Sequence, residues 1–199
     1  MNNGNRVFRS MAALSTGLLL LFSGVSSPAS EAREIKAPRL GVLNLIGAKA
    51  GPLVADDLKA FTPLFGKATE SRGAPPRCDV LLVYARISDA GKVGNSNLNL
   101  RGIIRDSGAT VVIVASENSG DAYIGGAPNT GYGAANLVMT IDRGGAKFAA
   151  FFVRLFKKMF SGTTMPVAWV QLVPQVPGMD HPDVPEAIFA AEAGQVTFR

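Results

Sequence analysis

A chain of 199 residues is long enough for one domain once any processed segment is removed. Hydrophobic residues make up 47% of it and charged residues 18%, so the chain can bury a core and is not disordered as a whole. The formal net charge of +5 comes from scattered lysines and arginines that form no basic block with exposed aromatics. This distribution argues against a nucleic-acid partner.

Residues 1–29 have the layout of a secretory signal peptide. Two arginines form a basic start, an apolar stretch runs from 11 to 25, and the small residues S-S-P-A-S-E-A follow. The apolar stretch is shorter than the roughly twenty residues that span a bilayer, although a retained anchor is the alternative interpretation. We therefore expect cleavage near Ala29 or Ala32 and an exported, periplasmic or secreted product. Its formal charge is +3, from 18 basic and 15 acidic residues.

Residues 30–199 predict one domain in which buried strands and helices alternate. The apolar run 39–47 predicts a strand, and helical spacing predicts a helix over 54–62 that Pro63 helps to end. After a loop at 71–77, a strand is expected at 78–85, a helix at 99–108 and a strand at 109–116. A glycine-rich loop, 117–134, then leads to the rest of the domain.

The C-terminal part continues the alternation. A strand is expected at 136–142, a helix at 146–160, a second helix or a turn at 165–173, and one or two short strands around Gly194 in the tail 187–198. Strands that consist of continuous apolar runs, with helices between them, imply a mainly parallel sheet that is covered on both faces. The sequence therefore predicts an α/β fold, a three-layer sandwich.

The strand ends predict where a ligand would bind. In open parallel sheets, ligands lie beyond the carboxyl ends of the strands. Arg86, Ser88 and Asp89 follow one predicted strand, and Glu117 and Asn118 follow another. We expect these five residues, with the 117–134 loop, to form a binding surface for a protein or peptide ligand of unknown identity.

Ser116 ends the predicted strand 109–116 and is a candidate nucleophile. A serine nucleophile needs a base within hydrogen-bond reach, and His181 is the only histidine in the chain. The G-x-S-x-G elbow is absent, because Val114 and Asn118 occupy its glycine positions. A serine-type hydrolase using Ser116 and His181 is the alternative; an ordinary turn residue is the favoured interpretation.

Three other patterns have simple structural interpretations. Cys78, the only cysteine, begins a strand, and we expect it to be buried and not paired with His181. D-H-P-D at 180–183 offers metal ligands, but adjacent residues seldom converge on a metal, so a surface loop is favoured and no metal or other cofactor is expected. G-Y-G-A-A-N at 131–136 partly mimics a dinucleotide fingerprint but precedes a strand.

The aromatic and basic helix expected at 146–160 suits weak contact with a membrane surface. The favoured interpretation is a crossover helix packed on the sheet, because the neighbouring strands need a cover.

The stretch from Cys78 to Trp169 resembles the core of caspase-like peptidase domains, in particular of the bacterial CHAT type. The resemblance covers about half of the chain and rests on the order of the elements and on the types of residue in them, without a diagnostic signature. It is carried by C-D-V-L-L-V-Y-A-R, L-N-L-R-G-I-I-R-D-S-G-A, V-V-I-V-A-S-E-N-S-G, G-A-A-N-L-V-M-T-I-D, F-F-V-R-L-F-K-K-M-F-S-G and M-P-V-A-W-V-Q-L.

The resemblance implies a caspase-like topology without the catalytic dyad. The histidine of the family would fall near Ala85 or Arg86, neither of which can act as a general base. Its cysteine would fall on Ser116, whose hydroxyl stays protonated at neutral pH without an imidazole beside it. The expectation is therefore a catalytically silent relative that acts as a binding or scaffold module.

Overall fold

The computed structural model describes residues 32–46, 51–88, 91–94, 96–119, 122, 135–173 and 184–199. A six-stranded sheet forms its centre, in the order β3-β2-β4-β5-β6-β7. β2 (Leu40–Asn44), β3 (Ala68–Ser71), β4 (Val80–Tyr84), β5 (Val111–Val114) and β6 (Asn136–Asp142) are parallel, and β7 (Glu186–Ala191) runs antiparallel to β6. A separate pair of parallel strands, β1 (Arg33–Ile35) and β8 (Val196–Phe198), joins the two ends of the described chain.

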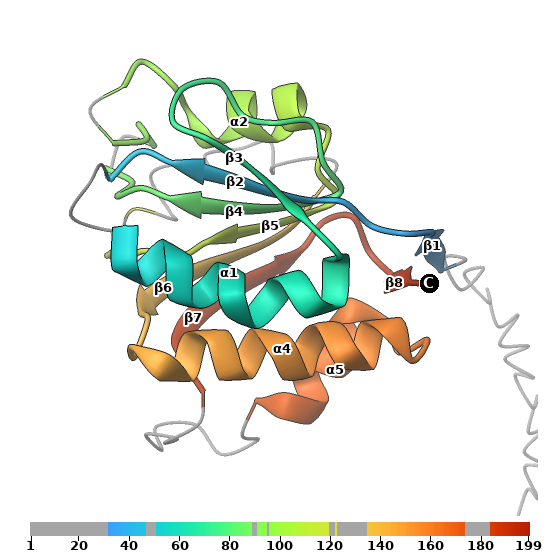
Figure 1. Ribbon diagram of the computed structural model, residues 1–199. Helices are drawn as coiled ribbons and strands as arrows, with labels where there is room; N and C mark the ends of the chain where they lie inside the picture. The colour runs from blue at the N-terminus through green and yellow to red at the C-terminus, as the bar shows by residue number, and fades with distance from the viewer. Residues whose placement is uncertain are drawn as a thin grey trace, which may run out of the picture.

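Helices cover both faces of the large sheet (Figure 1). α1 (Gly51–Phe65), α4 (Ala146–Phe160) and α5 (Met165–Leu172) lie on one face, and α2 (Leu100–Ser107) lies on the other. The prediction of a three-layer α/β sandwich with a mainly parallel sheet is confirmed.

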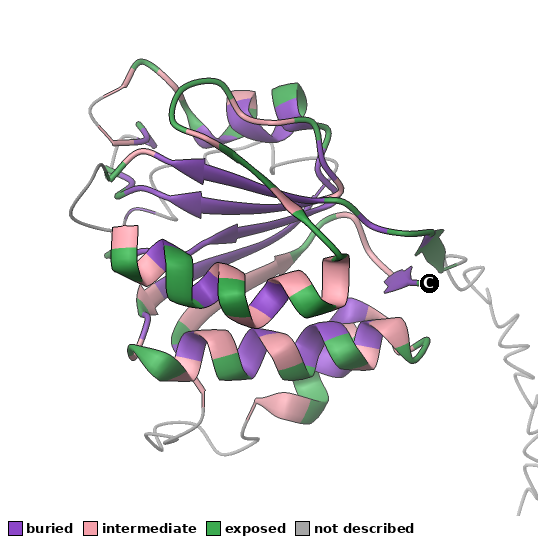
Figure 2. Cartoon of the chain, viewed as in Figure 1, coloured by how far each residue is buried: buried purple, intermediate pink, exposed green. Residues whose placement is uncertain are grey.

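The central strands are buried on both sides (Figure 2). Every residue of β2, β4 and β5 is buried, and alternate residues point to opposite faces, so the apolar side chains form two cores. The core beneath α1 and α4 is rich in phenylalanine, with edge-to-face contacts such as that between Phe61 and Phe156, whose ring centroids lie 5.7 Å apart. The core beneath α2 includes Leu100, Ile103 and Ile104.

Helix α4 has the bounds that the sequence predicts. Its six buried residues are Phe148, Phe151, Phe152, Leu155, Phe156 and Met159, and they pack in the phenylalanine-rich core. The apolar face that a membrane would contact is therefore turned toward the sheet. None of the helices in the described part of the chain is long and apolar enough to cross a membrane.

Helix α1 is longer than predicted, because Pro63 does not end it. The helix continues to Phe65 and ends at Gly66, which has a φ of 76° and donates its N–H to the Thr62 carbonyl at 2.8 Å. Proline removes only one hydrogen bond so close to the end, and Phe65 holds the last turn by packing against Phe156, with ring centroids 5.1 Å apart.

The tail forms two strands, β7 and β8, on either side of Gly194, as predicted. Strands β1 and β3 were not predicted. β3 is an edge strand of sequence A-T-E-S with no buried residue, so no apolar run marks it. The predicted signal peptide, residues 1–29, lies outside the described residues.

Candidate functional site

A cavity of about 390 Å³ lies where the central strands end. Within the sheet, β3 is the neighbour of β2 on one side, whereas β4 and then β5 follow on the other side of β2. The strand order therefore reverses between β2 and β4, and open α/β sheets bind ligands in the crevice at this point. We call it the tip cavity; it is lined by Leu45, Ile46, Leu53, Arg86, Gly94, Ala115, Ser116, Glu117 and Arg143.

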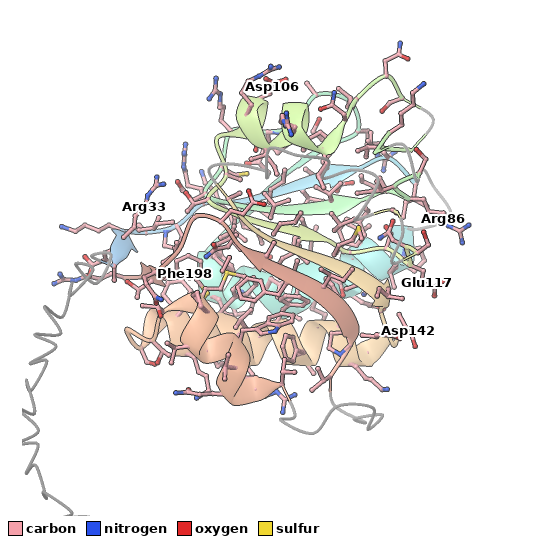
Figure 3. The ribbon with its side chains drawn as sticks, turned by 180° about the vertical axis from the view of Figure 1, so that it is seen from behind. Arg33, Arg86, Asp106, Glu117, Asp142 and Phe198 are labelled. Atoms are coloured by element: carbon pink, nitrogen blue, oxygen red, sulfur yellow. The ribbon has the colours of Figure 1, made fainter. Side chains whose placement is uncertain are left out.

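The tip cavity has apolar walls and a charged rim. Leu45 and Ile46 follow β2, and Leu53 lies in the first turn of α1. Arg86 and Glu117 are exposed, and Figure 3 shows both at the same edge of the molecule, away from Phe198. The rim therefore carries charges of both signs beside walls that are mostly apolar.

A buried ion pair holds Arg143 at this cavity. Nη2 of Arg143 lies 2.7 Å from Oδ1 of Asp57, and the two side chains are 6% and 2% exposed. The Tyr84 hydroxyl donates to Oδ2 of Asp57 at 2.5 Å, and Cζ of Arg143 lies 4.1 Å from the centroid of the Phe148 ring. These contacts fix the guanidinium group in one orientation.

The protonation of Tyr84 follows from the same surroundings. Burial, and then the neighbouring carboxylate of Asp57, raise the pKa of Tyr84 well above its usual range. The hydroxyl therefore keeps its proton at neutral pH and acts as a hydrogen-bond donor to Asp57.

The sequence analysis missed Asp57, Tyr84 and Arg143. Asp57 lies on the buried face of α1, one turn from Val54 and one turn from Phe61. An acidic residue in the middle of an apolar helical face was the available signal for Asp57. For Arg143, the signal was its position directly after β6, at the same edge as the predicted site.

Ser116 lies in the tip cavity with its backbone fixed and its hydroxyl unused. Its carbonyl oxygen lies 2.7 Å from Nδ2 of Asn118 and 2.6 Å from Oγ1 of Thr140. Its side-chain Oγ is shielded from solvent and has no hydrogen-bond partner among the described residues. No base in the described part of the chain is therefore in position to take its proton; His181 lies outside that part.

Asn118 connects the ends of three strands. Its Oδ1 accepts from the Ile87 N–H at 2.8 Å, and its Nδ2 donates to the carbonyls of Ser116 and Thr140 at 2.7 and 3.1 Å. The Asn118 side chain is buried, and both of its polar atoms bond within the protein. It ties the loops after β4 and β5 to each other and to strand β6.

The other predicted residues are distributed differently. Ser88 belongs to a hairpin after β4, where its N–H donates to the Lys92 carbonyl at 2.9 Å and its Oγ accepts from the Lys92 N–H at 3.1 Å. Asp89 lies outside the described residues, as does the D-H-P-D segment. Of the predicted site residues, the structure thus brings Arg86, Ser116 and Glu117 together at the tip cavity.

Cys78 lies at the other end of β4, and its predicted burial is confirmed. Burial, and then the charge of Asp79, raise the pKa of the Cys78 thiol to about 12, so little thiolate forms at neutral pH. Within the described ranges, no three His, Cys, Asp or Glu residues are grouped so as to hold a metal ion.

Comparisons with family models, with curated proteins and with solved structures find no match to this chain. The function is therefore inferred from the geometry of the tip cavity.

Proposed function

We propose that the protein is an exported, non-catalytic caspase-like domain that acts as a binding or scaffold module, and that it holds a segment of a protein or peptide ligand in the tip cavity. One observation carries the proposal. Ser116 lines a cavity at the strand ends, yet its Oγ has no partner among the described residues. Such a cavity can hold a ligand without activating a nucleophile.

The arrangement of the elements supports the caspase-like interpretation. The segments that carry the resemblance form β4, α2, β5, β6, α4 and α5, in that order. The histidine would fall near Ala85 or Arg86 and the cysteine on Ser116; of these residues, Arg86 and Ser116 line the tip cavity. A guanidinium group stays protonated and cannot act as a base, so the cavity has the location of an active site without its chemistry.

Binding is tested with two matched substitutions at exposed apolar residues. Ile46 lines the tip cavity and is 41% exposed; Val167 lies on α5 and is 45% exposed. The purified protein and its Ile46→Trp and Val167→Trp variants serve as baits for extracts of the producing cells, after thermal melting has shown that each is folded. We expect a protein that the wild type and Val167→Trp retain and Ile46→Trp loses. Equal retention by all three baits, or retention by none, would contradict the proposal.

The enzyme alternative is tested with a fluorophosphonate probe, which reacts with activated serines. We expect no labelling of Ser116, because no base among the described residues contacts its Oγ. Labelling that disappears in both Ser116→Ala and His181→Ala would establish the hydrolase instead.

Export is tested on the N-terminus of the protein recovered from the cell envelope or the medium. β1 begins at Arg33, so cleavage near Ala29 or Ala32 would leave every described strand and helix intact. Mass spectrometry should find a chain that starts at Ser30 or Arg33. A chain that retains Met1 would argue against a cleaved signal peptide.

A further inference from the structure

We infer that the tip cavity takes an aliphatic carboxylate, that is, a carboxylate group attached to a small apolar group. The inference rests on the proposed function, because it names the ligand chemistry of the same cavity. It is built from two unbonded donor atoms of residues that line the cavity, from the charges of the lining residues and from the apolar walls.

Two buried polar atoms of the lining residues lack hydrogen-bond partners within the described part of the chain. They are Oγ of Ser116 and Nε of Arg143, and both residues are 5% exposed. Leaving such groups without partners is costly, so native proteins usually supply a partner from protein, water or ligand. The guanidinium N–H groups can only donate and the serine hydroxyl can donate, so the matching ligand atom is an acceptor.

The charges favour an acceptor with a single negative charge. Arg143 carries a positive charge, and its Nη2 donates to Asp57 while Nε remains unbonded among the described residues. Leu53 places the first turn of α1 at the cavity, and this turn contains no acidic residue, so the positive end of the helix dipole is not neutralised from within it. Glu117 at the rim and Asp57 behind Arg143 disfavour a second negative charge, which argues for carboxylate over phosphate.

The walls select an apolar group next to the carboxylate. Four of the lining residues are aliphatic: Leu45, Ile46, Leu53 and Ala115. A volume of about 390 Å³ lies within the size range of small-ligand sites, which are mostly apolar with a few polar groups that fix orientation. A free branched-chain acid and the C-terminal residue of a peptide both offer this combination.

Arg143 is already held in place for such a ligand. Asp57 binds one edge of the guanidinium, Phe148 lies against its face, and Tyr84 holds Asp57. Because these contacts fix Arg143 without ligand, little side-chain entropy is lost on binding. Asp57 and Tyr84 are thus positioning residues for Arg143.

The test compares acids with their uncharged amides. ¹H–¹⁵N spectra of the purified protein are recorded during titration with 3-methylbutanoate, 3-methylbutanamide, and a short peptide that ends in leucine with either a free carboxylate or an amide. We expect the acids to shift the amide signals of residues 45–46 and 115–117, and the amides to bind at least about tenfold more weakly, since a hydrogen bond to a charged group is lost. A preference for the peptide acid or for the free acid identifies the source of the carboxylate.

Two variants test which groups hold the carboxylate. Ser116→Ala should weaken acid binding about tenfold and leave the melting temperature unchanged, because the removed Oγ has no partner among the described residues. Ser161→Ala is the matched control, since its Oγ bonds the Lys158 carbonyl at the end of α4, and it should bind the acids like the wild type. Arg143→Lys keeps the charge but removes Nε, and should weaken the acids more than the amides.

Equal affinity for acids and amides at residues 45–46 and 115–117 would overturn the carboxylate inference and leave the proposed binding function standing. Acid binding that is unaffected by both Ser116→Ala and Arg143→Lys would also overturn it. If none of the compounds shifts these signals, the inference is wrong, and the Ile46→Trp experiment decides separately whether the cavity binds a protein partner.

Discussion

Removing the Asp57 carboxylate should destabilise the fold more than any surface substitution. In Asp57→Ala, the Arg143 guanidinium stays charged in a site where its side chain is 6% exposed, and the Tyr84 hydroxyl loses its acceptor. Breaking a buried ion pair in this way costs about 3–5 kcal/mol, because one charge remains buried without compensation. A loss near the middle of this range is a large part of a typical domain stability of about 5–15 kcal/mol.

Urea unfolding, followed by circular dichroism and by Trp169 fluorescence, measures this loss. For a domain of this size the melting temperature should fall by roughly 10 °C. Asp106→Ala is the matched control, because Asp106 pairs with Arg105 at 2.8 Å on the exposed surface of α2, where such a pair contributes little. If Asp57→Ala unfolds at the same urea concentration as Asp106→Ala, the reasoning about the buried pair is wrong.

A double-mutant cycle separates the ion pair from the packing. Arg143→Met alone leaves the Asp57 charge buried with Tyr84 as its remaining partner, so it should also be strongly destabilising. The double variant Asp57→Ala/Arg143→Met leaves no buried charge, so it should cost less than the sum of the single variants by at least about 1 kcal/mol. Simple additivity would show that the two residues do not act as a pair.

Three further predictions concern the surroundings of the cavity and the far end of β4. Tyr84→Phe should cost about 1 kcal/mol in urea unfolding, since Asp57 keeps Arg143; a loss as large as that of Asp57→Ala would refute this. Asn118→Ala should cost about 1–3 kcal/mol and speed hydrogen exchange of the Ile87 amide, which loses its acceptor; unchanged exchange would contradict the proposed connection. Cys78 of the folded protein should not react with a thiol reagent at pH 8 and should react once on unfolding. Because the folded thiol has a pKa of about 12 against an ordinary value of 9.0, its contribution to stability is present below pH 9 and is lost as the pH rises toward 12; a Cys78→Ala variant should lack this part of the alkaline loss.

The architecture was predictable because its signals are local. Each signal is contained in one short segment of the chain: an apolar run for each of β2, β4, β5 and β6, and the helical spacing of apolar residues for α4. β3 gave no such signal, since A-T-E-S becomes a strand only by pairing with β2, for example Ala68 with Leu40. The predicted end of α1 at Pro63 was wrong for a related reason. The last turn is held by the packing of Phe65 against Phe156 and Phe198, which are distant in the sequence.

The site was predictable only in part. The rule that ligands lie beyond the strand ends is enough to find Arg86, Ser116 and Glu117. Asp57 and Arg143 each have a local signal, but no local pattern shows that these residues, 86 positions apart, form a pair. The sequence also does not show which of two nearby polar residues, Ser116 or Asn118, uses its side chain for hydrogen bonds within the protein. Asn118 was expected to bind a ligand; its side chain bonds Ile87, Ser116 and Thr140, and it is not among the residues that line the tip cavity.

Ser116 and Asn118, two of the polar residues that follow β5, use their side chains differently, and this difference supports the proposed binding role. Asn118 uses both of its side-chain polar atoms to hold the loops, whereas Ser116 keeps its Oγ unbonded among the described residues. The cationic lining residues, Arg86 and Arg143, can donate to a ligand but cannot accept a proton. Glu117, the one carboxylate among the described lining residues, is exposed and makes no hydrogen bond to Ser116 Oγ. A cavity whose described residues supply donors and no positioned base suits the retention of an acceptor group better than the activation of a nucleophile.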